Sequence, residues 1–469
     1  QARSRTYYDS VRQLVALSEV KAVITYPDME PTLRAHLEGI PTLGAILSIA
    51  ELEPGGHLAD YLDRAPSRPE DTAFLQHSSG STGLQEGVML SHGAVLSQIA
   101  AYSAAIALRP DDVIVSWLPL YHDMGLIAGF ILPIVQGIHL VLMSPFHWVR
   151  DPQILLRAIH EHRGTLCWLP NFAYNFLATR VRKSTLDGLD LSSLRAVINC
   201  SEPVRHESHN AFVGKYVPFG LPEDALATCY AMAENTFAVT QSPIGVPPNL
   251  DVIDRSLLME RQIAQPSDGA DGPTVTMVSC GIPIPNTEIR IVDAERRDLP
   301  DRRVGEIALR SDCMLTGYYH RDDATAQAMQ DGWYFTGDLG YVADGELYIT
   351  GRLKDLIIVG GKNVYPQDIE HVLNSVPGVH PGRTVAFGIL NESLGTEDVA
   401  VICEVDTDDP AERDRITKEI RSQIAQTTDV MAHYVHLVER GWLIKTSSGK
   451  IARTANREKF MEEVLGQTS

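Results

Sequence analysis

The chain has 469 residues, of which 44% are hydrophobic and 21% are charged, and this ordinary globular composition leaves room for two or more domains. A formal net charge of −20 argues against a general nucleic-acid-binding surface, although local basic patches could still bind an acidic carrier. The six cysteines are scattered without a C-x-x-C pair, which argues against a disulfide framework or zinc site and fits a reducing cytoplasm. We expect no membrane span and no signal peptide, because the apolar runs are short.

The first half of the chain alternates between helical and strand-like patterns. Residues 10–18 predict a helix, residues 21–25 a short strand, and another helix follows. Further along, helices are predicted at residues 93–107 and 152–162, and strands at residues 72–75, 112–118, 138–143, 165–169 and 194–199. Strands separated by helices of about ten residues or more predict mostly parallel sheets with crossover helices.

The pattern changes after residue 274. The short, glycine-bounded runs TVTMVSCG, TEIRIVD, GEIALRS and GELYITG predict an antiparallel, barrel-like section. After Arg352 we expect a smaller unit with helices at 366–374 and 410–426, strands at 384–390 and 398–405, and a final strand plus tail. Residues 244–273, rich in Pro, Asp and Gly at both ends, are predicted to form a surface insertion.

Residues 76–88, QHSSGSTGLQEGV, give the first chemical signal. Serine, threonine and glycine fill six consecutive positions, which are Ser78, Ser79, Gly80, Ser81, Thr82 and Gly83. Glycine lets backbone N–H groups point at an anion, and hydroxyls add further donors, so the stretch predicts a phosphate-binding loop. It is not a Walker loop, because G-x-x-x-x-G-K-[ST] is absent, and a Ser/Gly-rich surface turn is the competing interpretation.

Seven more motifs follow in a defined order: SWLPLYHDMGLI, LPNFAY, INCSEPVR, CYAMAENTFAVT, YFTGDLGYV, GRLKDLIIVGGKNVYPQDIE and KTSSGKIART. Each is weak alone, but their order resembles the adenylate-forming superfamily. Within it, WLPLYHDMGLI, PNFAYNF, LDLSSLRAVIN and the long spacer before VSCGIPIP resemble the fatty acyl-AMP ligases. The resemblance is strong over residues 75–454, and it implies that about a hundred N-terminal residues usual in the family are missing.

The resemblance implies an α/β fold with two domains. Residues 1–351 would form an adenylation domain of two mostly parallel αβα sheets plus a small β-barrel, and residues 352–469 a smaller mobile α+β lid with its hinge near Lys354. The implied activity joins a fatty or related carboxylic acid to ATP, with Mg²⁺, giving acyl-AMP and pyrophosphate. The acyl group then passes to a thiol of an acyl carrier protein.

The resemblance also assigns residue roles that fit this chemistry. Lys450 would bridge the carboxylate and the α-phosphate, Glu234 would reach Mg²⁺ directly or through water, and His122 would line the acyl–carboxylate channel with Asp123 orienting its ring. Residues 78–83 would hold the β- and γ-phosphates, and the remaining nucleotide contacts would come from Ser201, Glu202, Pro203, Tyr230, Ala231, Met232, Asp338 and Arg352. Tyr230 would lie flat on adenine, and Asp338 would accept from the ribose hydroxyls. Asn171 and Phe172 would lie close to the acyl pocket.

Some features keep other interpretations open. Gln85 and Glu86 stand where the family usually has Pro and Lys, and a carboxylate near a triphosphate repels it unless it points outward. Ala231 stands where glycine is usual beside the tyrosine. Seen alone, Tyr230 also fits a core aromatic, Asp338 a turn and Lys450 a solvated lysine. One alternative is an acyl-CoA synthetase. It is disfavoured by the spacer at 244–273, because an insertion in this region is held to restrain the C-terminal domain in fatty acyl-AMP ligases. The other alternative is a catalytically weakened nucleotide-binding relative, which only Glu86 supports.

Overall fold

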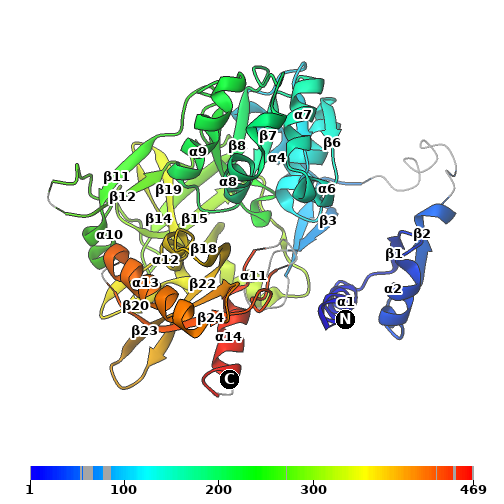
Figure 1. Cartoon of the computed structure of the whole chain (residues 1–469). Coiled ribbons are helices and arrows are strands. Elements are labelled where there is room, and N and C mark those ends of the chain that lie inside the picture. Colours follow the sequence, from blue (N-terminus) through cyan, green and yellow to red (C-terminus); the bar gives the residue numbers. More distant parts are fainter. Residues whose placement is uncertain are drawn as a thin grey trace.

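The computed structural model describes residues 2–52, 55, 67–77, 86–270, 272–428, 430–446 and 450–466, and the side chains only from residue 8 onward. The six positions predicted to hold phosphates, residues 78–83, and Gln85 lie outside the described residues. Figure 1 shows a large body of sheets and helices with a smaller C-terminal unit coloured orange to red.

The largest sheet has seven strands in the order β13-β10-β9-β8-β7-β5-β6. Its strands are β5 (Val113–Ser116), β6 (His139–Leu142), β7 (Leu166–Leu169), β8 (Ala196–Asn199), β9 (Leu226–Ala231), β10 (Ala238–Gln241) and β13 (Ile282–Pro283). Pairing is parallel from β6 to β9 and antiparallel from β9 onward. The predicted parallel strands are confirmed, and β7 and β8 are buried along their whole length, as a sheet covered on both faces requires.

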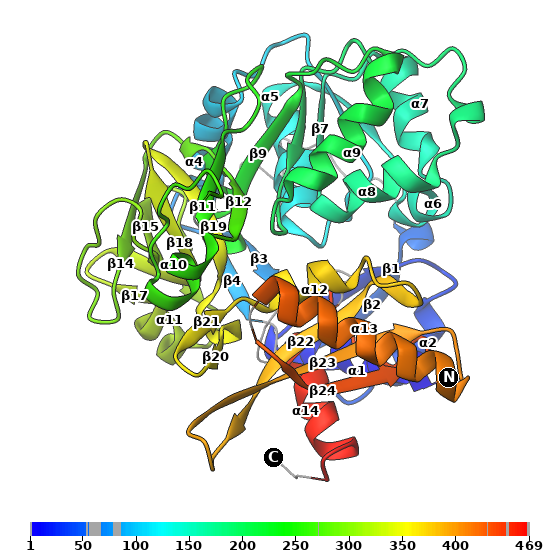
Figure 2. The same ribbon diagram turned by 60° about the vertical axis from the view of Figure 1, so that its left-hand side comes forward.

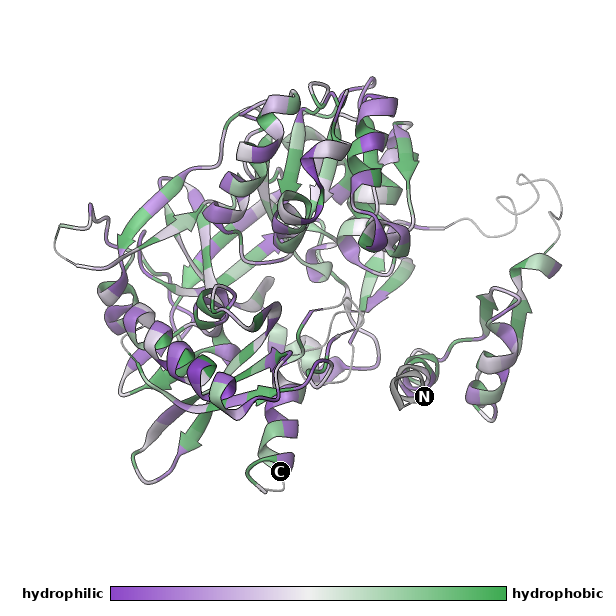
Figure 3. Ribbon diagram, viewed as in Figure 1, coloured by the Kyte–Doolittle hydropathy of each residue, from purple (hydrophilic) through white to green (hydrophobic). Residues whose placement is uncertain are grey.

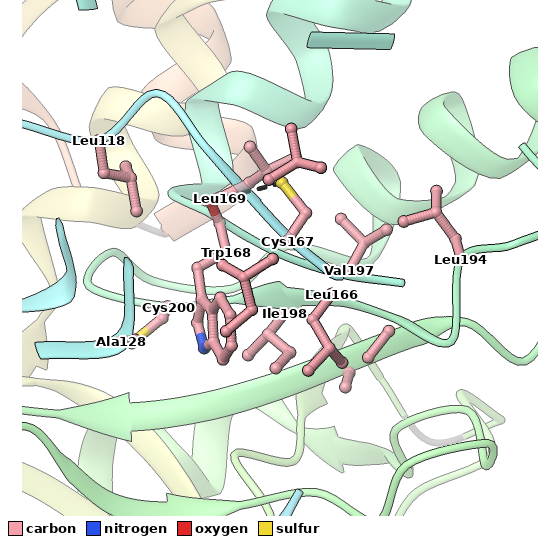
Figure 4. Close-up of a cluster of buried hydrophobic side chains, with 14 of the residues drawn as sticks. Leu118, Ala128, Leu166, Cys167, Trp168, Leu169, Leu194, Val197, Ile198 and Cys200 are labelled. Carbon is pink, nitrogen blue, oxygen red and sulfur yellow. Dashed lines mark hydrogen bonds between the residues drawn. The ribbon is translucent and has the colours of Figure 1, made fainter. Parts of the chain in front are cut away.

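The connecting helices are α4 (His92–Ala105), α5 (Leu132–Gln136), α6 (Pro145–Arg150), α7 (Gln153–His162), α8 (Asn171–Arg180) and α9 (His206–Tyr216). Figure 4 shows Leu166, Trp168 and Ile198 of the sheet packed with their neighbours in the core. Trp168 is buried, and its indole N–H donates to the Tyr102 hydroxyl at 2.8 Å, so the core leaves this polar atom satisfied. All six cysteines are buried and free, in agreement with the sequence prediction.

Antiparallel sheets follow, as predicted. One has β14 (Thr287–Val292), β15 (Gly305–Ser311), β18 (Trp333–Ala343) and β17 (Met329–Gln330) in that order, with β19 (Glu346–Arg352) also paired to β18. Another joins β3 (Thr72–His77), β4 (Gly87–Ser91) and β16 (Gly317–Tyr318). The sequence predicts the helix after the phosphate loop but not β4, which pairs with β3 as a hairpin around that loop.

Residues 244–273, predicted as a surface insertion, have mostly exposed or half-buried side chains in their described part, but they also form secondary structure that the sequence did not predict. This segment contains β11 (Leu250–Asp254), which pairs with β12 (Thr274–Val278), and the helix α10 (Arg255–Arg261). Ile253, Leu258 and Met259 are buried. The segment therefore lies at the surface and is anchored to the fold by a few buried apolar side chains.

The C-terminal unit is built around the sheet β22-β23-β24. Its elements are β20 (Ile357–Val359), β21 (Lys362–Val364), α12 (Pro366–Leu373), β22 (Val379–Asn391), β23 (Thr396–Val405), α13 (Pro410–Thr428), β24 (Ala432–Val438) and α14 (Arg453–Glu463). Successive residues of β22 face opposite sides, since Ala386 joins one hydrophobic cluster with α12 and α13, and Phe387 joins another with Phe460 of α14. Figure 2 shows this unit beneath the main body, with α12 nearest to it.

The N-terminal elements α1 (Ala2–Leu17), β1 (Ala22–Thr25), α2 (Glu30–Leu37) and β2 (Ala45–Ser48) form a small parallel unit of their own. In Figure 1 it stands beside the main body, and it contacts that body through Ser18, whose hydroxyl lies 2.9 Å from Nε2 of His77. Two mostly parallel sheets are predicted before residue 351. The seven-stranded sheet is one of them, and the only other parallel pairing in the described part of this region is the two-stranded pair β1–β2.

Hydropathy follows this layering. Figure 3 shows apolar colour concentrated on the central strands and polar colour on the outer turns of the helices. Within the part of the chain that the structure describes, no helix combines the length and apolar character needed to span a membrane.

Candidate active site

Tyr230, Asp338 and Arg352 come together where β9 ends beside the hairpin β18–β19. The Tyr230 hydroxyl donates to Asp338 Oδ2 at 2.7 Å, and Arg352 Nε donates to Asp338 Oδ1 at 3.1 Å. Burial, and then the Asp338 carboxylate, raise the pKa of Tyr230 well above its usual range, so the phenol remains a donor. Each carboxylate oxygen of Asp338 keeps a second lone pair, which leaves it able to accept from ribose hydroxyls.

A short loop after β8 carries Ser201, Glu202 and Pro203. Ser201 has a φ of 69°, an unusual left-handed conformation for a residue with a side chain. Glu202 Oε2 accepts a hydrogen bond from the backbone N–H of Phe172 at 2.9 Å. Burial raises the pKa of Glu202, while the positive charge of Lys450 opposes that rise.

Lys450 reaches this loop from the far end of the chain. Its Nζ donates to the backbone oxygen of Ser201 at 2.8 Å, across 249 residues of sequence. The contact joins the C-terminal unit to the main body. It places the lysine amine beside the same loop that carries Glu202.

His122 and Asp123 form a pair at the start of a π-helix, η2 (Met124–Ile131). Nδ1 of His122 lies 2.6 Å from Asp123 Oδ1, as expected for a carboxylate that orients the ring. Burial alone would raise the pKa of Asp123, but His122 and the Met124 amide together lower it. A Cβ on Gly125 would lie 2.3 Å from the Pro119 carbonyl oxygen, so glycine is required for this turn to close on itself.

Glu234 lies in the 3-10 turn η5 (Ala233–Asn235). Its Oε1 accepts from the Tyr318 hydroxyl at 3.1 Å, and that hydroxyl lies 2.9 Å from the hydroxyl of Tyr334. Burial raises the pKa of Glu234, while the hydrogen bond from Tyr318 and the charge of Arg352 oppose that rise. The described residues contain no cluster of three or more metal-ligating side chains, so a single carboxylate would leave most coordination positions to phosphate and water, which is the mode Mg²⁺ favours.

The two residues predicted near the acyl pocket have different surroundings. The Asn171 side chain braces neighbouring segments: it donates to Ser208 Oγ at 3.1 Å, and its oxygen accepts from Asn199 Nδ2 and the Arg205 amide. The Phe172 side chain is 47% exposed, with its ring edge-on to Trp117 and Trp148 at 6.3 and 6.2 Å.

The sequence reasoning misses the pair Trp117 and Trp148. Their rings stack at 3.7 Å and 5° beside Phe172, and both are buried. Trp117 lies in the SWLPLY motif, and that position was the one available signal for an aromatic wall here.

Glu86 is turned toward a cation. Its Oε1 lies 3.5 Å from Nη1 of Arg321, so its charge is balanced from outside the predicted phosphate loop. Arg321 therefore supplies a partner for the Glu86 carboxylate among the described residues.

Comparison with known proteins places this site in a family. Residues 4–319 match the model of the AMP-binding enzymes, and residues 361–457 match the model of the AMP-binding enzyme C-terminal domain. The chain belongs to the AMP-binding enzyme family and is an adenylate-forming ligase.

Within that family the similarity is to fatty acyl-AMP ligases. A medium-chain-fatty-acid–[acyl-carrier-protein] ligase of Moorena producens is 36% identical over 417 residues, which cover 86% of this chain and 70% of that protein. A long-chain-fatty-acid–AMP ligase of Mycolicibacterium smegmatis is 33% identical over 448 residues, covering 85% of this chain and 70% of that one. A structure from a study of the fatty acyl-adenylate ligases of E. coli and L. pneumophila superposes with a TM-score of 0.90 at 30% identity, covering 98% of this chain and 82% of the other.

Proposed function

We propose that this protein activates a fatty or related carboxylic acid with ATP, releases pyrophosphate, and passes the acyl group from acyl-AMP to the thiol of a carrier protein. The observation that carries the proposal is the bond from Lys450 Nζ to Ser201, which brings a cation of the last predicted motif to the loop that carries Glu202. The Moorena producens relative is named for transfer to an acyl carrier protein, which supports the second step.

Each side chain has a role that its position supports. The Lys450 amine neutralises the carboxylate and the α-phosphate as they approach, a preorganised electrostatic effect that acts most strongly away from water. Tyr230 offers its ring face to adenine, and Asp338 accepts from the ribose with Arg352 beside it. A fatty acid is already ionised at neutral pH, so the reaction does not require His122 to remove a proton from it. The role of His122 is therefore to shape the acyl–carboxylate channel.

The residues present also fit a magnesium ion. Glu234 would hold Mg²⁺ together with phosphate oxygens, and the ion when bound would neutralise charge on the departing pyrophosphate. Burial raises the pKa of Glu234, and a bound ion would stabilise the charged form of this carboxylate.

We assign the domains as residues 1–351 and 352–469, with the hinge at Lys354. The C-terminal elements enclose a hydrophobic cluster that includes Ile369, Val401 and Ile420 and that takes one residue, Met259, from the main body. Lys354 lies in the short turn η6 (Leu353–Asp355), at the junction between β19 and that cluster.

The insertion at 244–273 favours a carrier protein over coenzyme A as acceptor. Met259 of α10 packs in the C-terminal cluster, and its carbonyl accepts from Asn363 Nδ2 at 3.1 Å. Lys362 pairs with Glu260 of the same helix at 3.5 Å. These contacts restrain the lid in its present orientation, which is the effect attributed to this insertion in fatty acyl-AMP ligases.

The test is an acyl-AMP assay on the purified protein. With ATP, Mg²⁺ and fatty acids of graded length, we expect acyl-AMP by mass spectrometry, and acyl transfer to a phosphopantetheinylated carrier but not to free coenzyme A. Lys450→Ala lowers product formation by about a hundredfold or more but leaves a measurable rate. Lys418→Ala, which alters a 75% exposed lysine of α13, leaves product formation unchanged. Acyl-coenzyme A as the main product would instead establish the synthetase alternative, and bound ATP without any acyl-AMP would establish the weakened relative.

A further inference from the structure

Arg453 joins four segments of the C-terminal unit through one guanidinium group. It is the first residue of α14, three positions after Lys450. Nη1 donates to Asp355 Oδ2 at 2.5 Å, Nη2 donates to Glu370 Oε1 and Oε2 at 2.8 and 3.0 Å, and Nε donates to the Ala386 carbonyl at 2.9 Å. The side chains of Arg453, Asp355 and Glu370 are each at most 20% exposed.

In this cluster the Arg453 guanidinium is bound to the Asp355 and Glu370 carboxylates, and all three groups are largely shielded from bulk water. Burial alone would lower the pKa of Arg453, but Glu370 and Asp355 raise it. Glu370 Oε1 also accepts from the Ala386 amide at 2.9 Å, so the carboxylate is held from two sides. Removing the guanidinium would leave two buried carboxylates facing each other, a costly state that no other cation in direct contact relieves among the residues described.

The residues on either side of Lys450 are hydrogen-bonded to one another and to Asn456 of α14. The Ala452 amide donates to the Ile444 carbonyl at 3.0 Å, and the Thr446 amide donates to the Lys450 carbonyl at 2.8 Å. The Asn456 side chain accepts from the Ile444 amide at 2.8 Å and donates to its carbonyl at 2.9 Å. The segment that carries Lys450, called here the lysine arm, is therefore fixed to α14 and, through Arg453, to Asp355 and Glu370.

The chain on either side of the proposed hinge is anchored to different bodies. Arg352 Nε binds Asp338, which belongs to the adenylation domain. Asp355, three residues later, binds Arg453, which belongs to the lid. Only Leu353 and Lys354 lie between these two anchors.

We infer that Arg453 is a positioning residue for Lys450: by fixing Asp355 to the lysine arm, it confines the rotation of the lid to Leu353 and Lys354 and makes the lid and its lysine turn as one body. The inference rests on the proposed function, in which Lys450 serves acyl-AMP formation and the lid reorients before acyl transfer. Among the described residues, the hydrogen bonds and ion pairs of Arg453 go to Asp355, Glu370 and Ala386, and none of these is a predicted nucleotide or acyl-pocket residue. The effect of Arg453 on the reaction passes through the placement of Lys450.

The experiment separates the two half-reactions. Pyrophosphate release reports acyl-AMP formation, and acyl loading of a phosphopantetheinylated carrier from supplied acyl-AMP reports transfer. In Arg453→Gln we expect formation to fall at least tenfold and transfer to stay within twofold, and we expect Arg453→Lys, which keeps the cation, to recover part of the loss. Arg457→Gln, an exposed arginine of the same helix, leaves both rates unchanged.

A second comparison distinguishes positioning from general damage. In a Lys450→Ala background, Arg453→Gln should slow acyl-AMP formation no further, because the group it positions is already absent. Should Arg453→Gln fail to fold, Asp355→Asn removes one arm of the cluster with little change of shape and is expected to give the same split. Equal loss in both half-reactions, or a further tenfold loss in the Lys450→Ala background, overturns the inference. Wild-type protein that makes no acyl-AMP overturns the proposed function instead.

Discussion

Arg205 and Asp368 form a contact between the two proposed domains that can be tested quantitatively. Arg205 follows the Ser201 loop in the main body, and Asp368 lies in α12 of the lid. Arg205 Nη2 donates to Asp368 Oδ1 at 2.7 Å and, at 3.3 Å, to the carbonyl of Gln367. Replacing Arg205 by Ala removes both bonds, while its backbone amide still donates to Asn171.

The size of the effect follows from burial. A hydrogen bond to a charged group is worth about 1.5–3 kcal/mol when protected from water, and an exposed ion pair about 0.2–1 kcal/mol. The Arg205 and Asp368 side chains are 20% and 34% exposed, so the pair lies between these limits. We take about 1–1.4 kcal/mol, which shifts the equilibrium between the present lid orientation and others by about five- to tenfold.

We therefore expect Arg205→Ala to lower acyl-AMP formation by about five- to tenfold at saturating substrates, with acyl transfer from supplied acyl-AMP unchanged or faster. Pyrophosphate release and carrier loading measure the two steps separately. The exchanged pair Arg205→Asp with Asp368→Arg should recover most of the loss. Arg163→Ala serves as the matched control. It breaks an ion pair with Asp190 that is also 2.7 Å long, but the Arg163 and Asp190 side chains are 57% and 44% exposed.

A double-mutant cycle of Arg205 and Asp368 that shows no coupling energy would refute this reasoning. If Arg205→Ala costs the same in wild type and in Asp368→Ala, the two residues act independently and the pair does not hold the lid. An equal slowing of both half-reactions would point to general loss of structure.

Three further predictions concern the nucleotide site and stability. Tyr230→Phe keeps the ring but removes the donor to Asp338, so the KM for ATP should rise about three- to tenfold, and Tyr230→Ala, which also removes the ring, should raise it further. Burial lowers the pKa of His209 to about 4, so the folded protein keeps this histidine neutral while the unfolded chain takes up a proton below about pH 6.5. The free energy of unfolding should therefore fall by about 2 kcal/mol between pH 7.5 and 5. Urea unfolding at the two pH values should show a smaller fall for His209→Gln. Glu86→Lys should change acyl-AMP formation by less than about threefold, because Glu86 pairs with Arg321 in a partly exposed contact; a gain above tenfold would show that the carboxylate acts on the phosphates.

The central sheet was predictable because its signal is local. Residues 112–118, 138–143, 165–169 and 194–199 are compact apolar runs, and a parallel strand buried on both faces requires such a run. The structure has β5, β6, β7 and β8 within these ranges. Their order in the sheet follows from crossover connections, which the intervening helices provide.

The elements that the sequence did not predict obtain their burial from distant partners. In α14 only Asn456 and Phe460 are buried, which gives too weak an apolar stripe to indicate a helix. In α10, Met259 is buried by a cluster from the C-terminal unit, about a hundred residues later in the chain. Neither packing surface is visible in a local window.

The candidate site shows the same limit. The order of motifs indicated which residues to group, but not which atoms meet: Tyr230 and Asp338 are 108 residues apart, and their bond became visible only in three dimensions. Asn171 is predicted to lie near the acyl pocket, and the sequence did not indicate that its amide bonds to Asn199, Arg205 and Ser208. Side-chain amides form bonds in many directions, so a motif position alone does not define which neighbour they choose.

The partner of Lys450 in this structure explains why a lysine suits the proposed step. Its amine is bound to a neutral carbonyl, that of Ser201, and Glu202, the acid of the same loop, is instead hydrogen-bonded to Phe172. A charged donor gains more from an anion than from a carbonyl, so an arriving carboxylate and α-phosphate compete well for the amine without first breaking an ion pair. The left-handed backbone of Ser201, a conformation that costs about 1 kcal/mol for a residue with a side chain, is the local strain that accompanies this placement. The lysine is thus presented in the place where charge is expected to develop, held by a bond weak enough to exchange.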